Sequence, residues 1–165
     1  MARISRDPYT WHSTSLGSAG KPGMVYDGLD EFNLPAKFRL VKHVNAVTVV
    51  SGHCAVLAAV PTDGTYIVTN DVTGGTTTPL VSAGTTSIAA GAYCCVPAEN
   101  EYCFILVEGW HTNLLGDGSV AIGEAITAKY ADGTWDTATS TIPVAGYAVT
   151  VDGGSPTVFT GFVRV

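Results

Sequence analysis

The stretch that decides the fold class is residues 120–165, VAIGEAITAKYADGTWDTATSTIPVAGYAVTVDGGSPTVFTGFVRV. Short apolar runs alternate in it with the dipeptides Asp132-Gly133 and Asp152-Gly153. An Asp-Gly pair between two such runs is a strong signal of a β-hairpin, because the tight turn requires residues that tolerate positive φ. We therefore predict a terminal β-module over residues 118–165.

The same strand pattern extends back to residue 37. The run YCFILV, residues 102–107, is apolar at every position, as expected of a strand buried on both faces. The chain holds 19 glycines and 21 threonines, which suit turns and pleated, half-buried surfaces respectively. We predict an all-β protein, an antiparallel β-sandwich or small β-barrel with an extended irregular N-terminal arm. The other predicted strands of the body are residues 38–50, 53–60, 65–69 and 88–96.

Two segments of the body share an order of features. Residues 52–69, GHCAVLAAVPTDGTYIVT, and residues 123–139, GEAITAKYADGTWDTAT, each run from Gly through an apolar strand to Asp-Gly-Thr, an aromatic residue and a Thr-rich end. This order fits a sandwich or barrel built from two related hairpin units. The alternative is a chance similarity between two β-hairpins.

Residues 1–36 lack sustained periodicity and form a separate segment before the body, residues 37–165. They contain Pro8, Pro22 and Pro35 together with four aromatic residues. A disordered tail is usually poor in aromatics. Two alternatives follow: an arm that becomes ordered by lying on a partner or on its own body, and a flexible tail.

Charged residues make up 13% of the chain, where a soluble monomer has about 25%. The low value suggests that other protein covers much of the surface. The net charge of −6 disfavours nucleic acid as the main ligand. Residues 1–42 carry a net +2 and the rest a net −8. This split fits an arm that docks on an acidic surface, and chance is the alternative.

The leading residues, MARISRDPYTWH, carry positive charges without an apolar stretch behind them, so no signal peptide is predicted. No run approaches the roughly 18 apolar residues of a membrane span. We therefore expect the protein to be made and used in a cytoplasm, where its cysteines stay reduced.

The four cysteines, Cys54, Cys94, Cys95 and Cys103, lie in apolar runs. Three interpretations are open: small buried hydrophobes with reduced thiols, a structural metal site with neighbouring histidines, and a disulfide formed in an assembled state. The absence of a C-x2-C pair argues against metal, and we predict no metal and no cofactor. Cys94 and Cys95 should point to opposite faces of a strand. A catalytic thiol is disfavoured because apolar surroundings raise its pKa.

The aspartates that precede glycine are expected to serve as turn residues, with a calcium site on one such loop as the alternative. Among the tryptophans, Trp110 is the strongest candidate for binding, in a predicted loop formed by Gly109, Trp110 and His111. Aromatic rings at loop tips anchor subunit interfaces, and they also stack on sugars. We predict Trp110 and His111 as an interface or ligand loop.

The order of elements over residues 90–165 carries a family resemblance. It comprises a G-x-Y run into an apolar strand that ends in Gly, a G-[DE]-x-[ILV] strand, a D-G hairpin, a VAG-x-A strand and a last strand. In this order the chain resembles the head decoration, or capsid cement, proteins of tailed bacteriophages. The insertion at residues 97–101 and the long arm depart from the simplest pattern. The matching pieces are Gly91-Ala92-Tyr93, Tyr102 to Gly109, Gly123-Glu124-Ala125-Ile126, Asp132-Gly133, Val144-Ala145-Gly146-Tyr147-Ala148 and Val158 to Val165.

The resemblance implies a structural, non-enzymatic virion protein that is assembled in the host cytoplasm. It implies binding to the major capsid protein on the outer surface of the head, at junctions between capsomers, as a trimer. Neither nucleic acid nor a membrane is an expected partner. The alternative is a glycan- or receptor-binding domain of a phage head or tail fibre. The residues predicted to contact the capsid are Arg3, Arg6, Tyr9, Trp11, Lys37 and Arg39.

Overall fold

A computed structural model describes residues 2–45, 48–72, 81–82, 86–128, 133–139, 144–151 and 157–165. The prediction of an all-β fold is confirmed: every regular element in these ranges is a strand. None of the described residues forms a helix long and apolar enough to cross a membrane. Of the predicted hairpin turns, Asp132, Asp152 and Gly153 lie outside the described residues.

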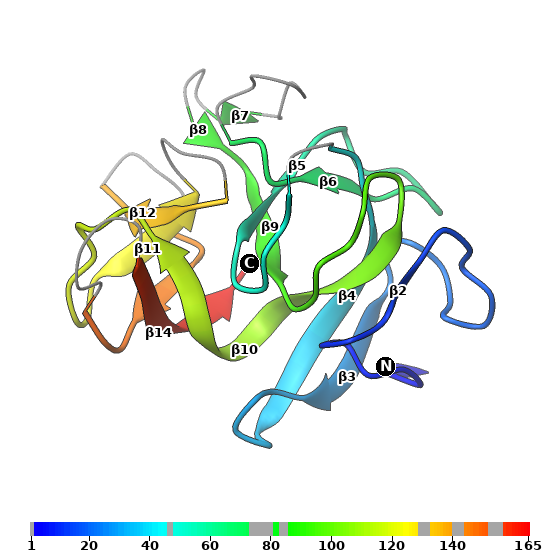
Figure 1. Cartoon of the computed structure of the whole chain (residues 1–165), viewed down its shortest axis with the longest axis horizontal. Helices are drawn as coiled ribbons and strands as arrows, with labels where there is room; N and C mark the ends of the chain where they lie inside the picture. The colour runs from blue at the N-terminus through cyan, green and yellow to red at the C-terminus, as the bar shows by residue number, and fades with distance from the viewer. Residues whose placement is uncertain are drawn as a thin grey trace.

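The body is built around one long strand, β10 (Tyr102–Gly116), which crosses the middle of the molecule (Figure 1). The strands before it are β4 (Pro35–His43), β5 (Cys54–Leu57), β6 (Ile67–Thr69), β7 (Val81–Ser82), β8 (Thr86–Ser87) and β9 (Ala89–Tyr93). The strands after it are β11 (Ala125–Ala128), β12 (Trp135–Thr137), β13 (Gly146–Ala148) and β14 (Thr157–Arg164). The leading segment adds β1 (Ala2–Arg3), β2 (His12–Ser13) and β3 (Val25–Leu29).

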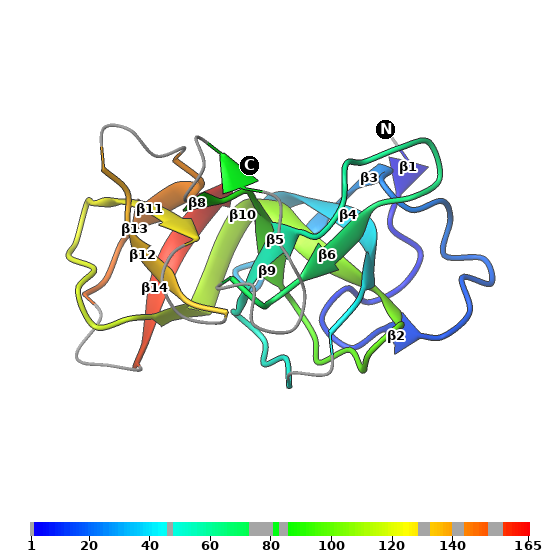
Figure 2. The same ribbon diagram turned by 90° about the horizontal axis from the view of Figure 1, so that it is seen from above.

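The hydrogen-bonded strand pairs form two closed circuits, and β10 belongs to both. In the first circuit β4 pairs with β6, β6 with β5, β5 with β9, β9 with β10, and β10 with β4. In the second, β10 pairs with β12, β12 with β11, β11 with β13, β13 with β14, and β14 with β10. Figure 2 shows the two sets of strands on either side of β10.

The two circuits have the same connectivity. Each starts with a long strand, continues through a hairpin whose second strand returns parallel to it, and closes with two antiparallel strands. The repeated segments 52–69 and 123–139 form the two equivalent hairpins, β5–β6 and β11–β12. The sheet is therefore mixed rather than purely antiparallel, because in each circuit one strand of the hairpin joins the long strand in the same direction.

The buried apolar residues form two clusters, and every strand of each circuit contributes to one of them. Both faces of β10 are buried over residues 103–107, as its sequence predicts: Phe104 and Leu106 face one cluster, and Cys103 and Ile105 face the other. The first core includes Val41, Ala55, Val68, Tyr93 and Ile105, one from each strand of its circuit. The second includes residues from every strand of the second circuit, and it continues onto the outer face of β4 and β10 through Phe38 and Phe104. Among the residues from the second circuit are Leu114, Ile126, Trp135, Ala148 and Phe159, one from each strand.

The leading segment lies on its own body. β3 pairs with β4 along five residues, so the sheet continues past the first circuit. The ring of Tyr9 packs edge-on against Phe38, with 5.9 Å between ring centroids, and Trp11 and Tyr26 both pack on Phe104, at 5.4 and 5.6 Å. These three aromatic residues of the segment thus cover the outer face of β4 and β10.

Candidate docking surface

The four cysteines are free and buried. This agrees with the interpretation in which they are small buried hydrophobic residues. Burial raises the pKa of the Cys54, Cys94 and Cys103 thiols, so the nucleophilic thiolate is suppressed. Cys94 lies in one core cluster and Cys95 in the other, which confirms their opposite orientation. Among the described residues, no three His, Cys, Asp or Glu side chains are grouped so that they could hold a metal ion.

The prediction that Gly109, Trp110 and His111 form a loop is wrong. β10 runs through all three without a break, and His111 is fully buried. Gly109 serves a close approach within the strand: its φ is +145°, and a Cβ there would lie 2.9 Å from the Cβ of Ala36. Glycine within a strand often marks such a close approach, so Gly109 did not signal a turn.

The His111 ring is neutral and fixed within the fold. Its Nδ1 accepts a hydrogen bond from the backbone N–H of Asn113 at 3.1 Å, so the Nδ1 contact with the Glu31 carboxylate at 3.7 Å is not an ion pair. Burial lowers the pKa of His111, although the Glu31 carboxylate opposes this effect. His111 is therefore not available as a surface ligand.

A second buried histidine, His43, was not singled out from the sequence. Its Nε2–H donates to the Asn45 carbonyl at 3.1 Å, and its Nδ1 accepts from the Tyr93 hydroxyl at 2.8 Å. Burial lowers the pKa of His43 to about 4. The only signal in the sequence was that His43 lies in the predicted strand at residues 38–50, in which apolar and polar residues largely alternate. Such a pattern indicates a core strand and not a binding site.

Five strands bring charged residues of alternating sign into one row on a sheet face. The register pairs Arg3 of β1 with Asp27 of β3, Asp27 with Lys37 of β4, Lys37 with Glu108 of β10, and Glu108 with Arg164 of β14. Residues directly opposite each other in a sheet point to the same face. The Lys37 ammonium lies 2.5 Å from the Glu108 carboxylate. We call this row the charge ladder.

An apolar row runs beside the charge ladder on the same face. Two residues further along β10, Trp110 lies opposite Phe162 of β14, and Phe162 lies opposite Tyr147 of β13. The Trp110 and Phe162 rings pack at 66°, 5.1 Å apart. Tyr147 is 52% exposed, and Leu29, two residues after Asp27 on β3, is 53% exposed. We call Leu29, Trp110, Phe162 and Tyr147 the apolar row.

The hairpin between β3 and β4 holds the apolar row in place. The Asp30 carboxylate accepts the backbone N–H of Trp110 at 3.0 Å, and the Glu31 carboxylate accepts that of Thr112 at 2.6 Å. The same Asp30 side chain accepts the N–H groups of Phe32 and Leu34, which forms the turn. The position of Trp110 is thus fixed by segments about 80 residues apart in the chain.

The structure assembles only part of the predicted contact set. Arg3 and Lys37 belong to the charge ladder, and Arg6 is exposed beside Ser18. Tyr9 and Trp11 are half-buried on the opposite face of β4 and β10, where they pack on the core. Arg39 lies two residues beyond Lys37, at a separate cavity.

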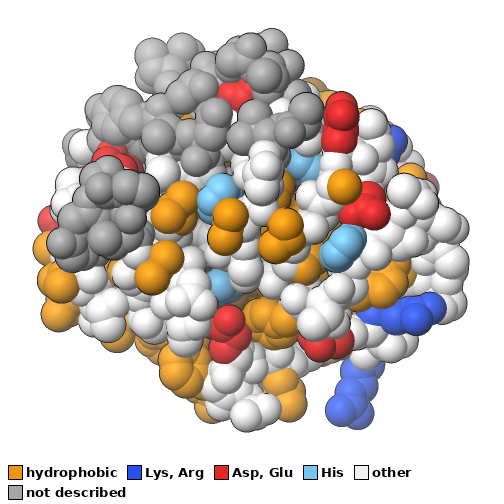
Figure 3. All heavy atoms as spheres, viewed as in Figure 1, with side chains coloured by type: hydrophobic (Ala, Val, Ile, Leu, Met, Phe, Trp, Pro, Cys, Tyr) orange, Lys and Arg blue, Asp and Glu red, His pale blue; other side chains and the backbone are white. Residues whose placement is uncertain are grey.

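The charge ladder and the apolar row together form the candidate docking surface, a sheet face that spans β1, β3, β4, β10, β14 and β13. On the face of the molecule shown in Figure 3, the hydrophobic side chains are widely scattered, whereas the Lys and Arg side chains lie toward the side of the leading segment. Comparison with protein-family models, with curated proteins and with solved structures finds no match to this chain.

Proposed function

We propose that this chain is a structural virion protein that binds the outer surface of a tailed-phage head at capsomer junctions and stabilises the expanded head. The observation that carries the proposal is the candidate docking surface, where a partly exposed apolar row lies beside a charge ladder. An exposed apolar strip with a polar border is the usual composition of a protein–protein interface. The order of sequence motifs over residues 90–165, which resembles that of phage decoration proteins, is the reason for proposing a phage head as the partner.

The charge ladder suits a surface that becomes buried in an assembly. Each cation in it lies between or beside anions, as the pairing of Lys37 with both Asp27 and Glu108 illustrates. Opposite charges directly across a sheet favour one another by about 0.2–1 kcal/mol. The attraction between neighbouring charges of the ladder therefore offsets part of the cost of desolvating them on docking. The apolar row contributes roughly 25 cal/mol for each Å² of apolar area buried.

The cysteine and histidine side chains of the body support a structural role. Burial raises the pKa of three of the four thiols and lowers the pKa of both His43 and His111, whose ring nitrogens are hydrogen-bonded within the fold. These groups take part in packing and in core hydrogen bonds. A trimeric state and the major capsid protein as partner belong to the same proposal.

A second candidate function is glycan or receptor binding by a phage fibre. The observation that favours it is the apolar row itself, because aromatic faces stack on sugar rings. The edge-on packing of Trp110 against Phe162 covers part of the Trp110 ring, so Tyr147 presents the largest exposed aromatic surface of the row. A glycan array that gives no binding would exclude this candidate.

The experiment that tests the proposal is a cryo-EM reconstruction of the purified protein mixed with matching undecorated, expanded heads. Density at capsomer junctions, with the apolar row against the capsid, is the expected result. Bare heads at saturating protein would refute it. In a matched pair of variants, Tyr147→Asp should abolish binding and Val50→Asp should not, since both side chains are 52% exposed and only Tyr147 is in the row.

A further inference from the structure

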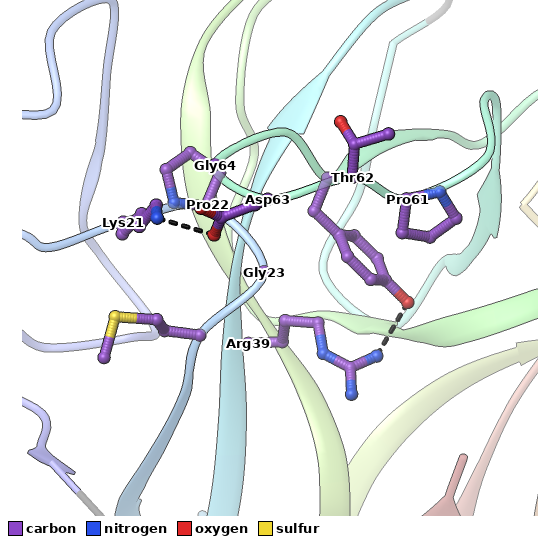
Figure 4. Close-up of a pocket in the computed structure, with 10 residues that line it drawn as sticks. Lys21, Pro22, Gly23, Arg39, Pro61, Thr62, Asp63 and Gly64 are labelled. Atoms are coloured by element: carbon purple, nitrogen blue, oxygen red, sulfur yellow. Dashed lines mark hydrogen bonds and ion pairs between the residues drawn. The ribbon is translucent and has the colours of Figure 1, made fainter.

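A cavity of about 400 Å³ lies between the leading segment and the turn that joins β5 to β6. Residues 21–24 form one wall and residues 61–66 the other, and Arg39 of β4 lies at the base (Figure 4). The cavity is distinct from the candidate docking surface. Neither the charge ladder nor the apolar row contributes a residue to it.

Arg39 is held in one orientation within this cavity. Its guanidinium carbon lies 4.7 Å from the centre of the Tyr66 ring, and its Nη1 donates to the Tyr66 hydroxyl at 2.7 Å. Stacking and this hydrogen bond fix the plane of the guanidinium, so its geometry is set before any ligand arrives.

The opposite edge of the same guanidinium lacks a partner. The Nε of Arg39 is buried and makes no hydrogen bond to any described residue. No carboxylate of the described residues forms an ion pair with Arg39, whereas the neighbouring Lys37 is paired. Nη2 on the same edge makes no hydrogen bond to a described residue either. It is not buried, so a charged acceptor can reach it and accept a strong hydrogen bond from it.

The charge around the cavity is positive, although the whole chain carries −6. Lys21 stands at the rim, with its ammonium 2.5 Å from the Asp63 carboxylate of the opposite wall. Lys42 lines an adjoining hollow that shares Pro22, Gly64 and Tyr66 with the cavity. Of the charged residues that line the cavity itself, Lys21 and Asp63 pair with each other, and Arg39 is left without an anion.

The walls indicate what kind of anion fits. Pro22, Met24 and Pro61 present apolar surface beside the one guanidinium, which suits a carboxylate on an apolar peptide more than a densely charged polyanion. We infer that the Arg39 cavity binds an acidic segment of a partner protein, with a Glu or Asp carboxylate on Nη2 of Arg39 and flanking side chains against Pro22 and Pro61. The inference goes beyond the proposed capsid role and does not depend on it.

The test uses the full chain and a fluorescein-labelled, end-capped peptide of alternating Glu and Leu, with a peptide of alternating Gln and Leu as the comparison. Fluorescence anisotropy should show binding of the Glu peptide, and the side-chain Nε–H NMR signal of Arg39 should shift on binding. Arg39→Met should weaken binding at least about tenfold, because a hydrogen bond to a charged group is lost. Arg6→Ala, which removes the same charge outside both the cavity and the candidate docking surface, should have little effect.

Equal binding of the Glu and Gln peptides, or no binding of either, would overturn the inference. Saturation of the Arg39 signal by sodium acetate or phosphate, with no gain from the peptide, would reduce the cavity to a free-anion site and also overturn it. If Arg39→Met does not fold, Lys21→Met keeps the test decisive, because the Lys21 side chain is 51% exposed. It should weaken binding of the Glu peptide by a smaller factor, and unchanged binding would count against the cavity.

Discussion

Acidification from about pH 7 to about pH 5 should destabilise this fold through His43. The His43 ring is fully buried, and its pKa falls from 6.5 to about 4 because burial disfavours the charged form. A histidine whose pKa is lower in the native state than in the unfolded chain does not reduce stability at pH values above its unfolded pKa. Its contribution is lost as the pH falls from about 6.5 toward about 4, and the loss levels off below that.

The size of the effect follows from the two pKa values. At about pH 5 the unfolded chain binds most of a proton at His43 and the native state binds little, which lowers the free energy of unfolding by about 2 kcal/mol. His111 should add to the loss, since burial lowers its pKa as well. The lowered pKa of Glu124 affects stability only at more acidic pH, where that carboxylate becomes protonated.

The assay is urea unfolding at a series of pH values, followed by tryptophan fluorescence, for the wild type and for His43→Gln. Glutamine retains a donor for the Asn45 carbonyl and an acceptor for the Tyr93 hydroxyl, and it does not titrate. The comparison uses the slope of the unfolding free energy with pH, so any constant cost of the substitution cancels. Equal slopes for the two proteins between about pH 7 and pH 5 would refute the reasoning.

Three further predictions concern stability and can be measured by the same unfolding assay. Gly52→Ala should cost roughly 1–3 kcal/mol more stability than Gly123→Ala. Both glycines have positive φ, +90° and +82°, but only at Gly52 would a Cβ clash with a backbone atom, the Asn113 carbonyl oxygen. Equal costs would contradict this. Tyr9→Phe should be neutral or stabilise by up to about 1 kcal/mol, because the buried Tyr9 hydroxyl lies near the Glu31 backbone without forming a hydrogen bond. A clear loss of stability would show that the hydroxyl has a partner. Lys37→Met should change stability by less than about 1 kcal/mol, since its ion pair is partly exposed, while it weakens capsid binding if the charge ladder is part of the interface.

Much of the local structure could be predicted from the sequence. The unbroken apolar run at residues 102–107 predicted a strand buried on both faces, and the structure places both core clusters against it. The similarity of residues 52–69 and 123–139 predicted two related hairpins. These features depend on side chains a few residues apart, which a linear pattern records directly.

The candidate site could not be predicted in the same way. The ladder residues Arg3, Asp27, Lys37, Glu108 and Arg164 are spread over almost the whole chain, and only the registers of four strand pairs bring them into one row. A shift of one residue in any of these registers would turn a ladder residue to the other face. Such registers are set by long-range packing, which no local pattern encodes.

The sequence by itself determined the all-β class and the strand that is buried on both faces, because apolar patterns and Asp-Gly turns act over short distances. The tertiary structure alone decided that β10 continues through Gly109 and Trp110 and belongs to both circuits. It also decided that His43 is neutral and that Arg39 keeps one edge of its guanidinium without a partner. These properties depend on what surrounds a side chain in space, and that is set only when distant strands pair.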